Sequence, residues 1–241
     1  MENQAGSMNS ALGCPGVGRM IEILLTMLLI LIAWPIALGA MLAVRLTSPG
    51  SALYFQDRLG LRGRRIRICK IRTMRQDCER ETGAVWSTPG DARVTRVGRF
   101  LRRCHIDELP QLIHILRGEM SLVGPRPERP EIVVQLEAAL PHYRRRLEAR
   151  PGLTGLAQVL QGPDSDLGSV GRKLELDLLY LERRCLSLDL KILLATLLHL
   201  VDVPSRKIAR FLDVALDEAV APAAASESTS DGVSIEATFA G

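Results

Sequence analysis

The chain has 241 residues and a formal net charge of only +4, yet the segment from residue 58 to 103 holds fourteen Lys and Arg against four Asp and Glu. Such a basic segment attracts an anionic partner, which is a nucleic acid, an anionic membrane surface or a phosphorylated small molecule. Aromatic residues make up only 4% and no helix-turn-helix or zinc-module pattern is present, so we expect no nucleic-acid partner.

The N-terminal part of the chain predicts a membrane anchor. Residues 1–18 are mostly small or polar, and we expect them to be disordered. Residues 20–46 are apolar apart from Glu22, Thr26 and Arg45, and are long enough to cross a hydrocarbon core of about 30 Å as a helix. The run is too long for a cleaved signal peptide. We place the anchor at residues 19–47.

Two features of this anchor favour a re-entrant helical hairpin over a spanning helix. Pro35 lies near its middle, where proline removes a backbone hydrogen bond and favours a break or kink. Arginines flank both ends, so the positive-inside rule gives no orientation. A hairpin that dips into one leaflet leaves both ends in the cytoplasm. A spanning helix is the alternative, and a buried core helix is disfavoured because the segment is more apolar than a core helix requires.

Residues 48–214 form one predicted globular domain, followed by an Ala- and Ser-rich tail, 215–241, that we expect to be disordered. Segments 52–56 and 65–71 alternate like two strands of a hairpin around a Gly60–Gly63 turn. Helices are predicted at 109–117, at 130–149 with an interruption at Pro141, at 174–184 and at 186–201. The last is apolar on more than one face, so it is either a core helix or an interfacial membrane helix, and we favour the core. The fold class is α+β, mostly helical.

The five cysteines are odd in number and have neither CxxC nor zinc-site spacing. This pattern fits reduced cytosolic thiols better than a disulfide framework.

Two adjacent acids, Asp107 and Glu108, stand where the helix at 109–117 begins. Pro110 is tolerated only in the first turn of a helix, so the two acids fall at the N-cap or in the first turn. The helix dipole and the free N–H groups there favour negative charge, so we expect both acids to be ionised at neutral pH. Helix capping alone is the simplest interpretation, and the basic surroundings make a functional role more plausible.

Two rigid turns follow the acids. Gly124, Pro125 and Pro127 surround Arg126, and stiff backbone is well suited to aiming a guanidinium at a phosphate. A structural turn with a solvated arginine is the alternative. The second turn, residues 150–158, is punctuated by proline and glycine and offers Thr154 and Gln158 as hydrogen-bonding groups, although it could serve only as a connector.

Taken together, these blocks closely resemble the bacterial sugar transferases known as monotopic phosphoglycosyl transferases, in their small form. The resemblance runs from about residue 19 to 202, and each block is weak alone whereas the ordered set is specific. The matching blocks are Ser48-Pro49-Gly50, Phe55-Gln56-Asp57-Arg58, Lys70-Ile71-Arg72-Thr73-Met74, Thr95 to Arg103, Asp107-Glu108-Leu109-Pro110-Gln111-Leu112, Met120 to Glu128, Arg150-Pro151-Gly152-Leu153-Thr154-Gly155, Tyr180 and Ser187 to Ile192.

The resemblance implies an enzyme that moves a sugar 1-phosphate from a nucleotide-diphosphate sugar, here a UDP-sugar, to polyprenyl (undecaprenyl) phosphate, releasing nucleoside monophosphate. It implies that Asp107 is the nucleophile, which forms an aspartyl-phosphosugar intermediate, and that Glu108 helps to bind Mg²⁺. An ionised carboxylate is a competent nucleophile, and cations offset the repulsion between two anions. The reaction is the first membrane step of exopolysaccharide or glycoconjugate synthesis.

The same resemblance implies an N-terminal re-entrant anchor with Pro35 at its break, and a small cytoplasmic catalytic domain with a short β-hairpin and interfacial amphipathic helices. The chain is then expected at the cytoplasmic face of the bacterial inner membrane, in contact with its lipid and possible as a homodimer. Six further residues are candidates for binding substrate. Arg102 and Arg126, with Lys70 and Arg72 as weaker candidates, are expected on phosphate oxygens, and Arg150 and Gln158 in the nucleotide or sugar pocket.

Two positions depart from the family pattern. Trp34 replaces the serine that often precedes the anchor proline, which removes a hydroxyl that could bond freed backbone groups. His114 stands where an asparagine is common, and its place about two turns past Asp107 predicts a packing or interface role rather than a catalytic base. The rival to the enzyme is a membrane-anchored protein that binds an anionic polymer or lipid without chemistry.

Overall fold

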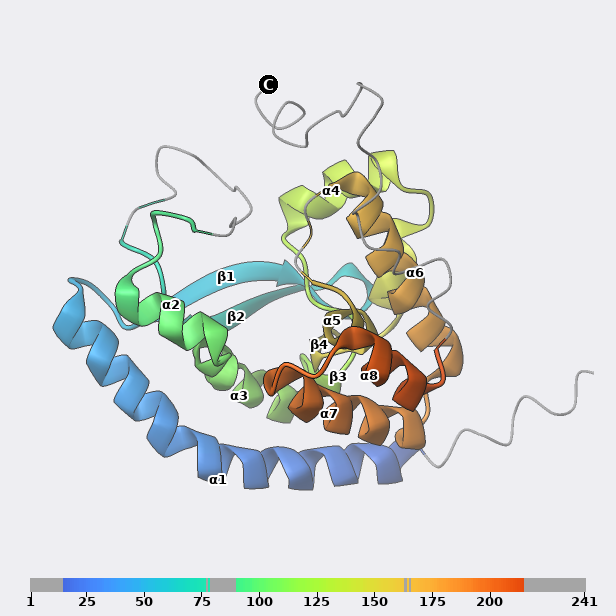
Figure 1. Cartoon of the computed structure of the whole chain (residues 1–241), viewed down its shortest axis with the longest axis horizontal. Coiled ribbons are helices and arrows are strands. Elements are labelled where there is room, and N and C mark those ends of the chain that lie inside the picture. Colours follow the sequence, from blue (N-terminus) through green and yellow to red (C-terminus); the bar gives the residue numbers. More distant parts are fainter. Residues whose placement is uncertain (1–14, 77, 79–89, 163, 165, 215–241) are drawn as a thin grey trace, which may run out of the picture.

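The computed structural model describes residues 15–76, 78, 90–162, 164 and 166–214 (Figure 1). Of the segments predicted to be disordered, residues 1–14 and 215–241 lie outside the described residues. The prediction was wrong for residues 15–18, which form the start of helix α1. The helices are α1 (Pro15–Thr47), α2 (Arg96–Arg103), α3 (Leu112–Leu116), α4 (Pro130–Ala139), α5 (Leu156–Leu160), α6 (Leu167–Arg183), α7 (Leu186–Leu200) and α8 (Ser205–Leu212). The 3-10 segments are η1 (Leu61–Gly63), η2 (Ile106–Gln111) and η3 (Tyr143–Glu148). The strands are β1 (Leu53–Leu59), β2 (Arg65–Ile71), β3 (Ser121–Val123) and β4 (Gly152–Thr154). The mostly helical α+β class is confirmed.

The anchor is one continuous helix, α1, which begins ahead of the predicted boundary and is bent part-way along its length (Figure 1). Pro35 lies inside it. The predicted fold-back into two arms is not observed in residues 15–47, because a proline removes a single ladder hydrogen bond and a helix accommodates that loss by bending. The segment from Gly18 to Thr47 is long and apolar enough to cross a membrane by length and composition, and little of it is buried in the protein.

Helix α1 lies along the domain rather than pointing away from it. Near its start, Arg19 donates a hydrogen bond to the carbonyl of Ile115. One turn later, the Glu22 carboxylate accepts hydrogen bonds from the Ser121 hydroxyl and from the Leu122 backbone N–H, the latter at 2.6 Å. The buried residues that join the second half of α1 to β2 and α2 are Ala37, Ala40, Val44, Ile71 and Leu101. Both halves of the anchor therefore pack against the same domain.

The predicted hairpin is confirmed: β1 and β2 pair antiparallel from Leu53 opposite Ile71 to Leu59 opposite Arg65. Strand β1 is longer than predicted because its last residue is buried and its N–H donates to the carbonyl of Glu128 at 2.9 Å. Alternation along β1 sends Tyr54, Gln56 and Arg58 to a cavity on one side of the ribbon. The opposite side carries Phe55, with the Arg67 guanidinium 5.3 Å from its ring centre.

The main hydrophobic core joins the hairpin to the C-terminal helices. Ile66 and Ile68 of β2 pack in one cluster with residues of α3, β3 and α5 to α8. Within this cluster Ile115, Met120, Ile192 and Ile208 are fully buried. A second cluster lies between α4, η3 and α6. The helix predicted for 130–149 with an interruption at Pro141 is confirmed as α4 followed by η3. These two cores hold the segments on either side of the acidic pair.

Strands β3 and β4 form a short parallel pair in which Gly152 stands opposite Ser121. A Cβ on Gly152 would lie 2.1 Å from the backbone nitrogen of Gly124, so only glycine allows the two turns to approach this closely. The rigid turn at 150–158 thus includes a strand, and its glycine serves backbone packing.

Gly98 allows a test of how closely α2 packs against the backbone of Thr73. A Cβ at Gly98 would lie 1.9 Å from the Thr73 carbonyl oxygen, and backbone there cannot move aside. We expect Gly98→Ala to lower the free energy of unfolding by about 1–3 kcal/mol. It should also displace Arg102, because the hydrogen bond from Arg102 Nε to the Thr73 hydroxyl, 2.8 Å long, depends on the position of α2. The measurement is thermal unfolding in detergent. Gly39→Ala, in α1 with open space around it, is the matched control, and an equal effect of both substitutions would contradict the prediction.

Candidate functional site

The acidic pair lies in the first turn of η2, as predicted, although the turn is 3-10 rather than α. Helix α2 ends at Arg103, and His105, with a left-handed φ of 54°, turns the chain into η2. Both acids are buried, with 8% of Asp107 and 7% of Glu108 exposed. Segment η2 packs on α1 as well as on β2. The anchor helix therefore directly supports the segment that carries the acids.

The two carboxyl groups differ sharply in their surroundings. Burial, and next the negative charge of Glu108, raise the pKa of Asp107 to about 6, although Lys70, Arg102 and Arg126 partly oppose this. No hydrogen bond to the Asp107 side chain occurs within the residues that the structure describes. Its environment therefore raises the pKa of Asp107, whereas the helix-dipole argument predicted stabilisation of the charged form. That this acid is ionised at neutral pH stays a prediction.

Glu108 is held by two cations. Lys70 Nζ lies 2.8 Å and Arg126 Nη2 2.6 Å from the same oxygen, Oε1. Burial alone would raise the pKa of Glu108, but Arg126 and Lys70 outweigh it and hold the pKa well below its usual range. Glu108 is therefore firmly ionised, and its charge in turn raises the pKa of Arg126.

A cavity of about 800 Å³ opens above the pair. Four of the predicted substrate-binding residues line it together with both acids: Lys70, Arg72, Arg102 and Arg126. Lining residues that were not assigned a role from the sequence include Tyr54, Gln56, Arg58, Thr73, His105 and Arg129. The structure thus gathers the four predicted cations around two carboxylates from β2 and the residue after it, from α2 and from the turn after β3.

Arg72 is bound more tightly than its prediction as a phosphate ligand suggests. Its Nη2 donates to the carbonyl and to the hydroxyl of Ser48, both at 2.9 Å, and its Nη1 donates to the Pro49 carbonyl. Arg72 therefore ties the end of α1 to the strand that carries Lys70. Its role as a phosphate ligand stays a prediction.

Arg150 and Gln158 are not among the residues that line this cavity. Arg150 is exposed, and the Gln158 amide donates to the Leu153 carbonyl at 3.0 Å. The structure therefore does not bring them to the acidic pair, and the alternative interpretation of 150–158 as a connector fits better. The reason is that β4 pairs with β3 and buries this turn behind the Arg126 segment.

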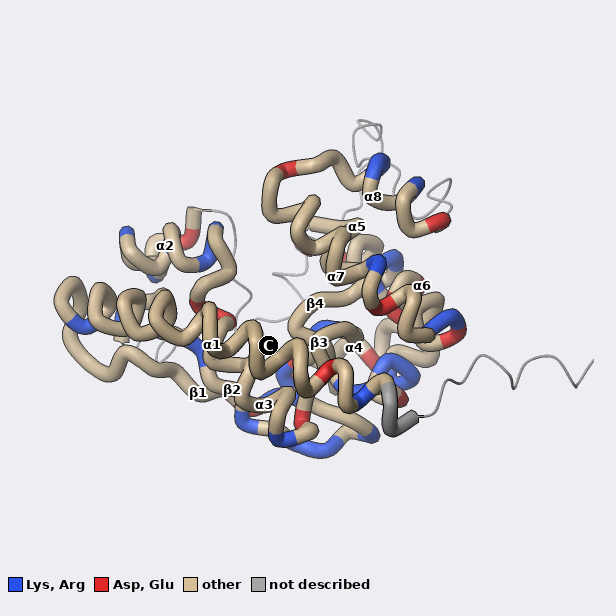
Figure 2. Tube along the Cα trace, turned by 90° about the horizontal axis from the view of Figure 1, so that it is seen from below, with Lys and Arg blue, Asp and Glu red and all other residues tan. Residues whose placement is uncertain are grey.

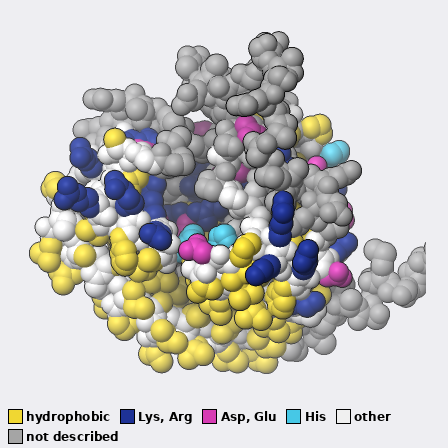
Figure 3. All heavy atoms as spheres, viewed as in Figure 1, with side chains coloured by type: hydrophobic (Ala, Val, Ile, Leu, Met, Phe, Trp, Pro, Cys, Tyr) yellow, Lys and Arg dark blue, Asp and Glu magenta, His cyan; other side chains and the backbone are white. Residues whose placement is uncertain are grey.

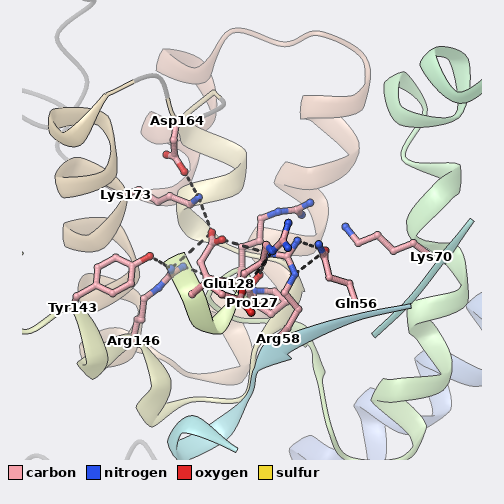
Figure 4. A network of polar contacts seen from close by, with 12 residues as sticks. Gln56, Arg58, Lys70, Pro127, Glu128, Tyr143, Arg146, Asp164 and Lys173 are labelled. Carbon is pink, nitrogen blue, oxygen red and sulfur yellow. Dashed lines mark hydrogen bonds and ion pairs between the residues drawn. The ribbon is translucent and has the colours of Figure 1, made fainter. Parts of the chain in front are cut away.

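A buried ionic network behind the cavity was not predicted (Figure 4). At its centre, the Glu128 carboxylate lies 3.4 Å from Arg58, 3.4 Å from Lys173 and 3.9 Å from Arg146. Lys173 also contacts Asp164 at 2.7 Å. The only hint in the sequence was the place of Arg58 and Glu128 inside matching motifs, because the other members lie far apart in the chain.

His114 packs as predicted. It is 4% exposed, and its Nε2 accepts a hydrogen bond from the Cys69 backbone N–H at 3.2 Å. Its Nδ1 must then carry the proton, which it donates to Glu119 at 2.5 Å. Both ring nitrogens are occupied, and the ring does not line the cavity with the acids.

Apolar side chains gather along one edge of the molecule, over α1 and α7 (Figure 3). Seen from below, α1 crosses this face and carries charged residues only near its ends (Figure 2). Helix α7 contributes to the core, as favoured from the sequence, because Ile192 and Ala195 are fully buried, whereas another row of its side chains is exposed. The large exposed apolar residues of α7 are Leu186, Leu190, Leu194, Leu197 and Leu200. Such a patch, continuous with an apolar helix, is typical of a membrane contact.

Comparison with known proteins agrees with this geometry. Residues 15–202 match the family described as bacterial sugar transferase. The chain is 39% identical, over 81% of its length, to UDP-N-acetylgalactosamine-undecaprenyl-phosphate N-acetylgalactosaminephosphotransferase of Aeromonas hydrophila. It is 46% identical over 74% of its length to UDP-glucose:undecaprenyl-phosphate glucose-1-phosphate transferase of Caulobacter vibrioides. It is 35% identical, also over 74%, to exopolysaccharide production protein PSS of Rhizobium leguminosarum bv. phaseoli.

These matches differ in how much of each relative they include. They cover 46% of the Aeromonas protein, 67% of the Caulobacter protein and 92% of the Rhizobium protein. The chain thus spans about half of the first relative and most of the last. The chain belongs to the bacterial sugar transferase family.

Proposed function

We propose that this chain transfers a sugar 1-phosphate from a UDP-sugar to undecaprenyl phosphate through a covalent intermediate on Asp107. The observation that carries the proposal is a buried carboxylate, with no hydrogen-bond partner among the described residues, at a cavity of about 800 Å³ lined by Lys70, Arg102 and Arg126. The names of the Aeromonas and Caulobacter relatives, which specify UDP-sugars and undecaprenyl phosphate, support this substrate class.

The chemistry follows from the difference between the two acids. Among the described residues, no hydrogen bond to the Asp107 side chain has to be broken, so an oxygen of its carboxylate can attack the phosphorus that bears the sugar. That P–O bond forms as the bond to the nucleoside monophosphate breaks, and the monophosphate leaves with the electron pair. An oxygen of undecaprenyl phosphate then attacks the same phosphorus and releases the Asp107 carboxylate. Arg126 and Lys70 stabilise the negative charge that develops on the phosphoryl oxygens.

The residues also fit a magnesium ion that arrives with the substrate. Mg²⁺ takes hard oxygen ligands, often one or two carboxylates completed by substrate phosphates. Glu108 and Asp107 are adjacent carboxylates, and the described part of the chain holds no group of three or more His, Cys, Asp or Glu that could bind a metal alone. When bound, the ion would neutralise phosphate charge and so favour attack by an anion. Glu108 remains the proposed protein ligand.

We further propose that α1 lies in the cytoplasmic leaflet instead of crossing the bilayer. Arg19 and Glu22 near its start bond to the domain, and Arg72 binds the backbone just beyond its end. A helix that crossed the membrane would carry one of these ends away from a domain on the other side. The exposed leucines of α7 would enter the same leaflet and bring the cavity near the lipid phosphate.

The test uses the purified chain in lipid nanodiscs with Mg²⁺ and a panel of UDP-sugars labelled in the sugar. We expect release of uridine monophosphate with one donor and label retained on the protein. The label should leave as a lipid product when undecaprenyl phosphate is added. No release with any donor, together with binding of an anionic lipid or polymer that survives Asp107→Ala, would establish the rival binding protein instead.

The pKa of Asp107 predicts how the first step depends on pH. Only the ionised carboxylate attacks, so the rate should fall about tenfold per unit below the pKa of about 6 and reach a plateau above it. The measurement is single-turnover release of uridine monophosphate between pH 4.5 and 8.5 at saturating donor. A rate that is flat or falls as the pH rises from 5 to 7 would contradict Asp107 as the nucleophile.

A further inference from the structure

The segment that carries Arg126 is held by its carbonyl groups. The carbonyl of Pro125 accepts a hydrogen bond from the Gly152 N–H at 2.9 Å, and that of Glu128 accepts one from the Leu59 N–H at 2.9 Å. Two prolines in this segment, at 125 and 127, have no N–H to offer. Its position therefore depends on donors supplied by other elements.

The two carbonyls between these points are both bound by arginine side chains. Arg146 Nη2 donates to the carbonyl of Arg126 itself at 3.0 Å, and Arg58 Nη1 donates to the carbonyl of Pro127 at 3.1 Å. We call this pair of arginines the carbonyl clamp. A guanidinium is planar and presents several donors in fixed directions, so it can bind a carbonyl and other partners at the same time.

Each arm of the clamp is itself held in place. Arg58 bonds the Gln56 side-chain oxygen twice, at 3.1 Å and 2.6 Å. Arg146 is 3% exposed, lies 2.7 Å from an Asp177 oxygen and donates to the Tyr143 hydroxyl at 2.6 Å. Glu128 lies between the two arms, 3.4 Å from Arg58 and 3.9 Å from Arg146 (Figure 4).

Burying two guanidinium groups is costly unless they are paired, and pairing alone seldom stabilises a fold more than apolar residues of similar volume do. A contribution to fold stability therefore does not explain why the two arginines of the clamp are buried. The arms of the clamp bind the carbonyl of Arg126 and that of the next residue, Pro127. Arg126 in turn donates from Nη2 to Glu108 Oε1 at 2.6 Å.

We propose that Arg146, with Arg58, is a positioning residue that holds the Arg126 guanidinium where it serves the acidic pair. This rests on the proposed function for its catalytic consequence. Arg146 does not line the cavity, so it acts through Arg126 rather than on the substrate. An error of about 1 Å in the place of a group at a reaction centre can cost about a hundredfold in rate.

The experiment removes the clamp while keeping a folded core. In the double variant Arg146→Met/Asp177→Leu, both partners of the buried pair become apolar residues of similar size, so no buried charge of that pair is left unpaired. We expect a thermal midpoint near that of the wild type and a loss of about 10- to 100-fold in kcat/KM for release of uridine monophosphate. Arg145→Met, which removes an exposed neighbour paired with Glu148 at 3.8 Å, is the matched control and should keep full activity.

A double-mutant cycle separates positioning from general damage. In an Arg126→Lys background the same double variant should lower kcat/KM by less than about threefold. The reason is that the effects of substitutions are not additive when one residue acts through the other. An equal loss in both backgrounds overturns the proposal. If the double variant fails to fold, Arg146→Lys replaces it in the cycle, since one ammonium cannot match the directions of the three guanidinium contacts.

A second readout is independent of catalysis. Hydrogen–deuterium exchange of a peptide covering residues 121–129 should be faster in the double variant than in the wild type and unchanged in Arg145→Met. Unaltered exchange in the double variant overturns the clamp. If the wild type releases no nucleotide from any donor, the proposed function fails, and the exchange result alone decides whether the clamp exists.

Discussion

Replacing Asp107 by asparagine is expected to abolish transfer and to stabilise the folded chain at the same time. An amide cannot form the acyl phosphate, so the first step should fall by at least about 10⁴-fold, as losses of a nucleophile do in other enzymes. The variant should still bind donor, because Lys70, Arg102 and Arg126 are untouched. Activity is measured as release of uridine monophosphate, and retention of label on the protein reports the intermediate.

The stability effect has a defined pH dependence. The pKa of Asp107 is about 6 in the folded chain against an ordinary value of 3.8. A folded pKa above the unfolded one means that wild-type stability is greatest below about pH 4 and is lost as the pH rises through about 6. The difference of about two pKa units corresponds to a loss of about 3 kcal/mol of wild-type stability when Asp107 ionises. Asparagine does not ionise, so the variant does not lose this stability. Thermal midpoints without divalent cation should therefore agree near pH 4 and favour Asp107→Asn above pH 6.5. A variant that is less stable at pH 8 would refute this account.

Glu108→Gln should have the opposite effect on stability. Lys70 and Arg126 are half-buried and would lose their carboxylate partner, so the cost should lie between about 1 kcal/mol, typical of an exposed pair, and about 3–5 kcal/mol, typical of a fully buried one. Activity should fall by at least about a hundredfold, because both cations lose the group that orients them. The measurement is the thermal midpoint together with donor turnover.

The stability effect of Glu108→Gln also depends on pH in the opposite direction to that of Asp107→Asn. The pKa of Glu108 lies well below its ordinary value of 4.5, so its stabilisation is present at neutral pH and is lost as the pH falls below about 4.5. The difference in thermal midpoint between the wild type and Glu108→Gln should therefore become smaller at acidic pH. Glu137→Gln, which removes an exposed pair with Arg144, is the control and should cost less than about 1 kcal/mol. If Glu108→Gln is as stable as this control, the ion pairs seen in the structure do not hold Glu108.

Local patterns were sufficient to predict most elements. Alternation and the glycine turn gave the hairpin of β1 and β2, and Pro110 placed Asp107 and Glu108 in the first turn of η2. These signals act within a few residues, where proline geometry and side-chain periodicity dominate. The fold-back at Pro35 was predicted from the same kind of signal and was not observed, because whether a proline bends or breaks a helix depends on what packs against it. In this chain the domain packs along both halves of α1.

Local patterns predicted only part of the lining of the cavity at the acidic pair. Arg126 was predicted from the rigidity of its turn, whereas the reason for that rigidity, the carbonyl bonds from Arg146 and Arg58, was not. Arg150 and Gln158 lie in a motif of similar composition, yet they are not at the cavity. A glycine- and proline-rich turn shows that the backbone is constrained, but it does not indicate which side of the turn faces a ligand.

By itself, the sequence determined the family, the apolar anchor, the hairpin and the place of both acids at the start of a helical turn. Only the tertiary structure decided that the anchor lies along the domain, that Asp107 has a raised pKa while Glu108 is held by two cations, and that a buried ionic network supports Arg126. The reason is physical. Propensity and periodicity act over one or two turns, whereas desolvation and ion pairing depend on which distant groups are brought within a few ångströms.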